Sequence, residues 1–165
     1  DRFWAINALG ATYYYEDRID ETIRYMHLAL ETLRTIDVSP HLATAMSNLA
    51  ASLVTVGDYA PARELAQDAL GMLPRYDNPQ LWLFVRSNLA EAQLGTGDAA
   101  GALETVDAML GDSSNPQRSA AQGHYLAVAA EVQMCRGSDE EDAVEMRIAR
   151  AEPPRLLERG DRLIL

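Results

Sequence analysis

Four consecutive acids and three histidines are the candidate metal ligands of this sequence. Residues 139–142 read Asp-Glu-Glu-Asp, and carboxylate oxygens are the ligands that Ca²⁺ prefers. Their spacing fits no calcium-binding loop, however, and they directly follow Ser138, so we interpret them as the first turn of a helix, where the helix dipole favours acids. The histidines lie far apart and form no HExxH pattern, so we expect no zinc site. They are His27, His41 and His124.

Catalytic chemistry has equally little support. Cys135 is the only cysteine, which excludes an internal disulfide and a site with several thiolates, and we interpret it as a small apolar residue of a reducing compartment. No glycine-rich phosphate loop follows a strand, and no serine occupies a signature nucleophile turn. We therefore expect no catalytic residue, no metal and no cofactor, and predict that the chain is not an enzyme.

The charge of the chain restricts the classes of partner. The 165 residues include 25 acids and 14 basic residues, all of them Arg, so the net charge is −11. Such a surface repels phosphate backbones and anionic membranes. No stretch approaches the roughly 18 apolar residues of a membrane helix, and no signal peptide opens the sequence. We expect no nucleic acid, no membrane and a cytoplasmic location.

An internal repeat of 40 residues organises the chain. Ser-Asn-Leu-Ala at residues 47–50 recurs at 87–90, and Gly-Asp at 57–58 recurs at 97–98. Extending the register in both directions gives columns of small or apolar residues, which indicates a repeated structural unit. The columns are Gly10, Ala50, Ala90 and Ala130; Asp17, Gly57, Gly97 and Gly137; Thr22, Ala62 and Ala102; and Met26, Ala66, Val106 and Met146.

Each unit has the pattern of two helices. Between the columns the apolar residues recur with helical period. Gly57 and Gly97 suit the left-handed residue that ends a first helix, and Asp58 and Asp98 can cap the second helix. We expect an all-α fold, an α-solenoid of about four antiparallel helix pairs in a single domain, 1–165. The pairs are 3–15 with 19–35, 40–56 with 59–73, 79–95 with 99–110, and 117–136 with 139–151. The units are 3–37, 40–74, 79–112 and 116–152, and 153–165 is a capping or truncated segment.

The repeat resembles the tetratricopeptide repeat. Ile6, Leu9, Gly10 and Tyr13 look like the W–LG–Y pattern of its first helix, and Ala62, Ala66, Ala69 and Pro74 look like the A–F–A–P pattern of its second. The spacing of 40 exceeds the usual length of about 34 and is similar to long-repeat variants in large bacterial signalling proteins. Thr22 stands where the family prefers Ala. The resemblance implies a right-handed superhelix whose first helices line a concave wall for a protein or peptide.

The resemblance also implies which residues line that wall. They are Asn7, Tyr14, Ser47, Asn48, Phe84, Ser87, Asn88, Glu91 and His124. In this family an Asn at the position of Asn48 and Asn88 commonly clasps the backbone of an extended peptide, since its amide both donates and accepts. The alternative is that both amides bond to neighbouring helices. Trp4 and Phe84 are candidate aromatic anchors, although Trp4 could equally cover a preceding repeat. The chain has no Lys for the family's carboxylate clamp, and Arg86 could replace it in part.

These observations favour a protein–protein or peptide interaction module whose partner is another protein or an adjoining domain of the same chain. The alternative is a sensory or regulatory arm that controls a diguanylate cyclase or transcriptional activator. The chain opens on Asp1 without Met and closes on an apolar triplet, 163–165, which favours a fragment of a larger bacterial protein. Self-association through the end units, giving a homodimer, is compatible with both.

Overall fold

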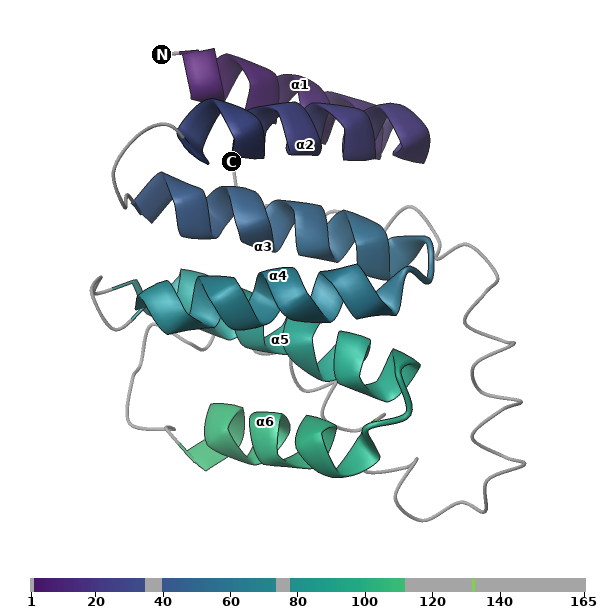
Figure 1. Ribbon diagram of the computed structural model, residues 1–165, viewed down its shortest axis with the longest axis vertical. Coiled ribbons are helices and arrows are strands. Elements are labelled where there is room, and N and C mark those ends of the chain that lie inside the picture. Colours follow the sequence, from purple (N-terminus) through teal and green to yellow (C-terminus); the bar gives the residue numbers. More distant parts are fainter. Residues whose placement is uncertain (1, 35–39, 74–77, 112–131, 133–165) are drawn as a thin grey trace.

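The computed structural model describes residues 2–34, 40–73, 78–111 and 132. Within them lie six helices and no strand (Figure 1). The helices are α1 (Arg2–Tyr15), α2 (Ile19–Arg34), α3 (Pro40–Thr55), α4 (Tyr59–Met72), α5 (Pro79–Gly95) and α6 (Ala99–Gly111). Each boundary lies within one residue of its expected position, so the first three helix pairs are confirmed. The expected fourth pair and residues 153–165 lie outside the described residues, apart from Val132.

The three described pairs stack into an α-solenoid. Within each pair the helices α1 and α2, α3 and α4, and α5 and α6 pack together, and α2 and α4 also contact the first helix of the next pair. Figure 1 shows this succession as layers that follow the order of the chain. A helix pair of this kind cannot bury its apolar faces alone, so stacking on the neighbouring pair forms the core.

One register position produces the turn inside each of the three described pairs. Asp17, Gly57 and Gly97 all have positive φ, of 60°, 79° and 85°. The residue after each glycine makes the hydrogen bond expected where a helix ends on a left-handed residue. The N–H of Asp58 donates to the carbonyl of Leu53 at 2.9 Å, and the N–H of Asp98 donates to the carbonyl of Gln93 at 2.8 Å. The repeated Gly-Asp dipeptide is therefore the signal that ends α3 and α5, while Asp17 takes the left-handed position after α1.

The two aspartates that follow these glycines differ as caps. Asp98 Oδ1 accepts the N–H of Gly101 at 2.9 Å, so the expected cap of α6 is confirmed. Asp58 makes no side-chain cap bond to α4, and that prediction is wrong. The reason is Pro61. It lies 40 residues before Gly101, so it has the same place in the second unit that Gly101 has in the third, and a proline has no N–H to donate.

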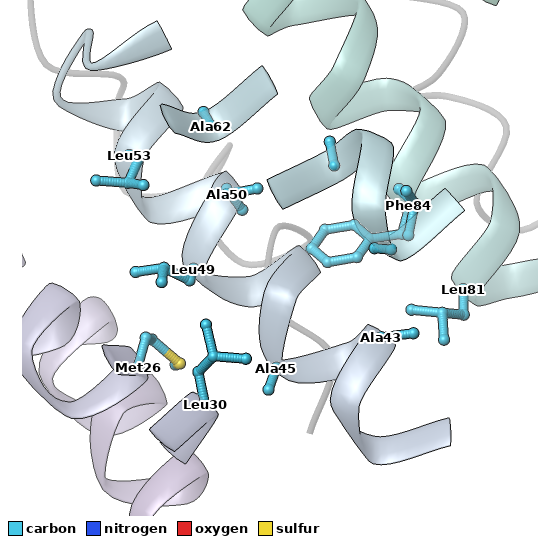
Figure 2. Packing of buried hydrophobic residues seen from close by; sticks show 14 of the residues in the cluster. Met26, Leu30, Ala43, Ala45, Leu49, Ala50, Leu53, Ala62, Leu81 and Phe84 are labelled. Carbon is cyan, nitrogen blue, oxygen red and sulfur yellow. The ribbon is translucent and has the colours of Figure 1, made fainter. Parts of the chain in front are cut away.

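The core lies where second helices meet first helices. Figure 2 shows Met26 and Leu30 of α2 beside Ala45 and Leu49 of α3, in one buried cluster that extends to Phe84 of α5. Small residues in the repeat columns allow close helix approach. A Cβ added to Gly10, for example, would lie 2.9 Å from Cε of Met26. A second cluster, formed by Ala90, Leu94, Ala102, Val106 and Val132, lies between α5, α6 and residue 132.

Candidate functional site

The first helices α1, α3 and α5 carry the residues predicted to line the partner-binding wall. Eight of the nine predicted wall residues are described, and every one of the eight is 3 % exposed or less. They are Asn7, Tyr14, Ser47, Asn48, Phe84, Ser87, Asn88 and Glu91. His124 lies outside the described residues. The structure therefore brings the eight residues onto three neighbouring helices, where their side chains are buried within the molecule.

The asparagine amides join these helices to one another. Asn48 Nδ2 on α3 donates to Asn7 Oδ1 on α1 at 3.0 Å. Asn88 Nδ2 on α5 donates to both the backbone carbonyl and the Oγ of Ser47 on α3, each at 3.2 Å. A buried amide is stabilised by such bonds and costly to leave without them. Both amides thus bond to the neighbouring helix, and a clasp on a partner's backbone stays a prediction.

An aromatic group at the start of α1 and α3 is partly exposed. Trp4 is 37 % exposed, whereas Phe3 is buried beside it. The ring centroids of Trp4 and His41 lie 4.9 Å apart in an edge-on arrangement, and Phe3 stacks on His41 at 5.6 Å. Sequence reasoning considered His41 only as a metal ligand and missed this contact, because residues 3 and 41 meet only when α1 and α3 stack. The Trp4 ring thus contacts both the Phe3 ring of its own helix and the His41 ring of α3.

The three tyrosines at the end of α1 have three different environments. Tyr14 is fully buried, while Tyr15 is exposed. Tyr13 is half-buried and stacks on Tyr25 of α2, with ring centroids 5.2 Å apart, and the Arg18 guanidinium lies over its ring at 4.4 Å. Tyr13 thus joins the two helices of the first pair.

Arg86 of α5 is the residue expected to assist in binding a carboxylate. Its guanidinium lies over the Trp82 ring, 4.2 Å from the centroid, and burial lowers its pKa. An arginine pKa lowered from such a high ordinary value still leaves the group charged at neutral pH. The same register position holds Ile6 and Met46 in the first two units, which pack against the core cluster. Arg86 therefore places a cation where the other units place an apolar side chain.

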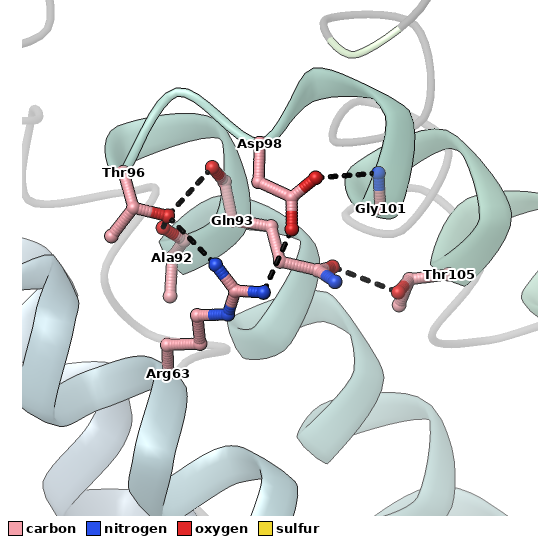
Figure 3. A network of polar contacts seen from close by, with 7 residues as sticks. All are labelled: Arg63, Ala92, Gln93, Thr96, Asp98, Gly101 and Thr105. Atoms are coloured by element: carbon pink, nitrogen blue, oxygen red, sulfur yellow. Dashed lines mark hydrogen bonds and ion pairs between the residues drawn. The ribbon is translucent and has the colours of Figure 1, made fainter.

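A polar network fastens the second unit to the third (Figure 3). Arg63 of α4 forms an ion pair with Asp98, with Nη2 and Oδ2 2.8 Å apart, and its Nη1 donates to Thr96 Oγ1 at 3.5 Å. Nearby, Thr105 Oγ1 of α6 donates to Gln93 Oε1 of α5 at 2.8 Å. Asp98 thus ends one helix, begins the next and binds the preceding unit. Sequence reasoning anticipated only its role as a cap.

The described residues contain no group of three or more His, Cys, Asp or Glu side chains that could hold a metal ion. The run 139–142 and Cys135 lie outside them. Among the described helices, none has both the length and the apolar composition needed to span a bilayer.

One comparison with known proteins finds a match to the first part of the chain. The family model described as tetratricopeptide repeat matches residues 1–75, which include α1 to α4. No curated protein and no solved structure matches the chain. The resemblance seen in the sequence is confirmed for this segment, and α5 and α6 continue the same packing order beyond it. The long-repeat bacterial type stays a prediction.

Proposed function

Because residues 1–75 match the tetratricopeptide repeat, we propose that the chain is a non-catalytic module that binds a protein or peptide along α1, α3 and α5. Repeats of this family generally mediate protein–protein interaction. The observation that carries the proposal is the alignment of the three first helices, joined through the Asn48–Asn7 and Asn88–Ser47 hydrogen bonds. Three helices held at fixed spacing provide an extended wall, which is what an extended chain or a helix needs for binding.

Trp4 is the proposed anchor for the partner. It is a partly exposed aromatic residue of α1, and its ring contacts the rings of Phe3 and His41. A rigid, amphipathic ring gives a large contact area at little entropic cost, which is why Trp is frequent among residues that dominate binding energy. The buried wall residues support this anchor by fixing the distance between helices.

Panning a random-peptide phage library on the purified chain tests the proposal. We expect enrichment of clones that bind the chain, and at least a tenfold loss of their binding to the Trp4→Ala variant, on the scale of a hot-spot residue. Val56→Ala is the matched control, because Val56 is also a large exposed apolar residue but lies outside the first helices. Absence of enriched clones, or equal binding to both variants, would contradict the proposal.

The double substitution Asn48→Ala and Asn88→Ala separates two roles for the amides. If they clasp the partner, binding of the enriched clones is lost while the melting temperature is unchanged. If they fix the helix spacing, the melting temperature falls together with binding, because each substitution removes a buried hydrogen bond. We propose the second role, which the two observed bonds support.

The partner is expected to be basic or neutral. The chain has a net charge of −11, so association with a cationic segment is favoured and weakened by salt. Enriched peptides should therefore be richer in Lys and Arg than the starting library. A cytoplasmic location, and the alternative role as regulatory arm of a cyclase or transcriptional activator, stay predictions. A cyclase or helix-turn-helix domain joined to this segment would support the regulatory role.

A further inference from the structure

The two joints between described units differ in chemistry at one end. The first joint is the contact of α2 with α3, and the second joint is the contact of α4 with α5. At the second joint the ring of Tyr59, which begins α4, lies where any Cβ on Gly95, the last residue of α5, would overlap it. Arg63, about one turn further along α4, forms the ion pair with Asp98 (Figure 3). The second unit thus presents a ring and a cation, and the third unit receives them on a glycine and a carboxylate.

The equivalent residues at the first joint are of another kind. Ile19 and Ile23 of α2 stand in place of the ring and the cation, and Thr55 of α3 stands in place of the glycine. Both isoleucines are half-buried and pack against the core cluster. Asp58, the equivalent of the paired aspartate, is exposed, and residue 23 offers it no charge. Each joint therefore has its own matched set of side chains.

The other stacking contacts do not distinguish the units from one another. Residues 47–50 of α3 and 87–90 of α5 have the identical sequence Ser-Asn-Leu-Ala. Within them, Asn48 and Asn88 both donate to the first helix of the preceding unit. Units that are this similar can stack in a wrong order, and such misassembly is a characteristic failure of repeat proteins. Information on the order must come from residues that differ between the joints.

We propose that the matched contacts of each joint determine which unit stacks on which. The glycine selects α5 over α3, because against the α3 of another molecule the ring of Tyr59 would meet the Cβ of Thr55, and such overpacking is destabilising. The arginine selects α4 over α2, because with α2 opposite α5 the carboxylate of Asp98 would face Ile23 and lose its ion pair. Each half of the match excludes one wrong pairing, and both halves agree on α4 against α5. The proposal concerns stacking alone and does not depend on partner binding along the wall.

The ring and the glycine are expected to contribute the larger part of this selection. Overlapping atoms inside a packed contact can be relieved only by moving a helix or a side chain. The ion pair between Arg63 and Asp98 is partly exposed on both sides, and partly exposed pairs contribute little. The experiments below therefore begin with Tyr59 and Gly95.

A cycle of substitutions at these two positions tests the match. Gly95→Thr alone should lower the urea midpoint of unfolding, because its Cβ enters the space of the ring. In a Tyr59→Ile background, which recreates the residue types of the first joint, the same substitution should lower the midpoint by at most about half as much. Gly71→Thr is the control, since a Cβ there meets no atom within 4 Å, and it should cost the same in both backgrounds.

The cycle has a decisive outcome even where a variant does not fold. If Gly95→Thr abolishes folding, the match requires that Tyr59→Ile restores the helical circular dichroism of the double variant. Equal losses at residue 95 with and without the ring, or no recovery in the double variant, would overturn the proposal.

The converse exchange asks whether the match can be moved to the first joint. Ile19→Tyr places a ring opposite Thr55 and should lower the urea midpoint. Adding Thr55→Gly should raise the midpoint again, although Thr55→Gly alone lowers it, since glycine weakens a helix. Simple addition of the two losses would show that the ring and the glycine do not recognise each other, which contradicts the proposal.

Distances between spin labels show where the effect lies. Asp20→Cys, Ala60→Cys and Ala100→Cys occupy equivalent exposed places at the start of α2, α4 and α6, and are made in a chain without its native cysteine. With Gly95→Thr the distribution of distances between residues 60 and 100 should broaden, while that between residues 20 and 60 stays unchanged. Tyr59→Ile should then make the first distribution narrow again. Broadening of both distributions would indicate a general loosening and would contradict a match that is specific to the second joint.

Discussion

The first helix of the stack and the first helices inside it have similar register residues and very different burial. In α1 only one stripe is buried, consisting of Phe3, Asn7, Gly10, Ala11 and Tyr14. In α3 every residue from 47 to 54 is buried, and in α5 every residue from 87 to 94 is buried. Eight consecutive helical residues point in all directions, so the inner helices are covered around their whole circumference.

This difference shows that a repeat acquires its core from its neighbours. Leu9, Leu49 and Leu89 occupy one register position, yet they are 39 %, 0 % and 5 % exposed. The same side chain therefore contributes little on α1 and much on α3 to the free energy of unfolding, since burial of apolar area sets the contribution. The following predictions test this contrast, beginning with the largest expected effect.

Leu49→Ala and Leu9→Ala compare one register position in the two environments. Leu49→Ala should lower the free energy of unfolding by about 2–5 kcal/mol, because it leaves a cavity between α2 and α3. Leu9→Ala should cost less than about 1 kcal/mol, since its side chain is already partly in water. Urea unfolding at a low protein concentration measures both. Equal losses would show that α1 is covered as completely as α3.

Gly95→Ala tests how tightly the inner units pack. A Cβ at this position would overlap the ring of Tyr59, so we expect a loss of about 1–3 kcal/mol. The control is Gly71→Ala on the exposed side of α4, where a Cβ meets no atom within 4 Å. There the lower entropy of Ala should stabilise the helix by about 0.5–1 kcal/mol. A stabilising effect at residue 95 would mean that Tyr59 moves away at little cost.

A double-mutant cycle on Asn7 and Asn48 tests the connection between α1 and α3. The single variants to Ala each remove one side of a buried hydrogen bond, and we expect a coupling free energy of about 1 kcal/mol. Thr12→Ala serves as the reference on α1, because its hydroxyl bonds only within its own helix, to the carbonyl of Ala8. Additive effects of the two Asn substitutions would show that the bond does not join the units energetically.

Arg63→Met should give the smallest effect. Its ion pair with Asp98 joins the second unit to the third, but both side chains are about one-third exposed, at 33 % and 31 %. Partly exposed pairs contribute about 0.2–1 kcal/mol, and salt screens them. The measurement is urea unfolding at low and high NaCl, with Arg18→Met as the control because its pair with Glu21 lies within one helix pair. A loss that salt does not reduce would indicate packing of the arginine stem rather than charge.

The helices of the described units were predictable because their signals are local. The helical period of the apolar residues marks each helix along its own length. The Gly-Asp dipeptides and the prolines between units lie within a few residues of the boundaries that they specify. The failed cap at Asp58 also has a local cause in Pro61. The register further predicted which residues share a wall, since residues 40 apart occupy equivalent places in stacked units.

The tertiary structure alone decided which of those residues are exposed. Asn48 bonds to Asn7, although its register equivalent in the first unit is residue 8. Arg63 forms an ion pair with Asp98, which lies 35 residues further along the chain, whereas the repeat is 40 residues long. Such contacts depend on how two units are offset and rotated against each other, and a repeated pattern contains no information on that geometry. Likewise, Leu9 and Leu49 are the same residue in the same pattern, and only the presence of α2 over one of them buries it. Local chemistry thus determines each helix, while contacts between units determine which surfaces remain for a partner.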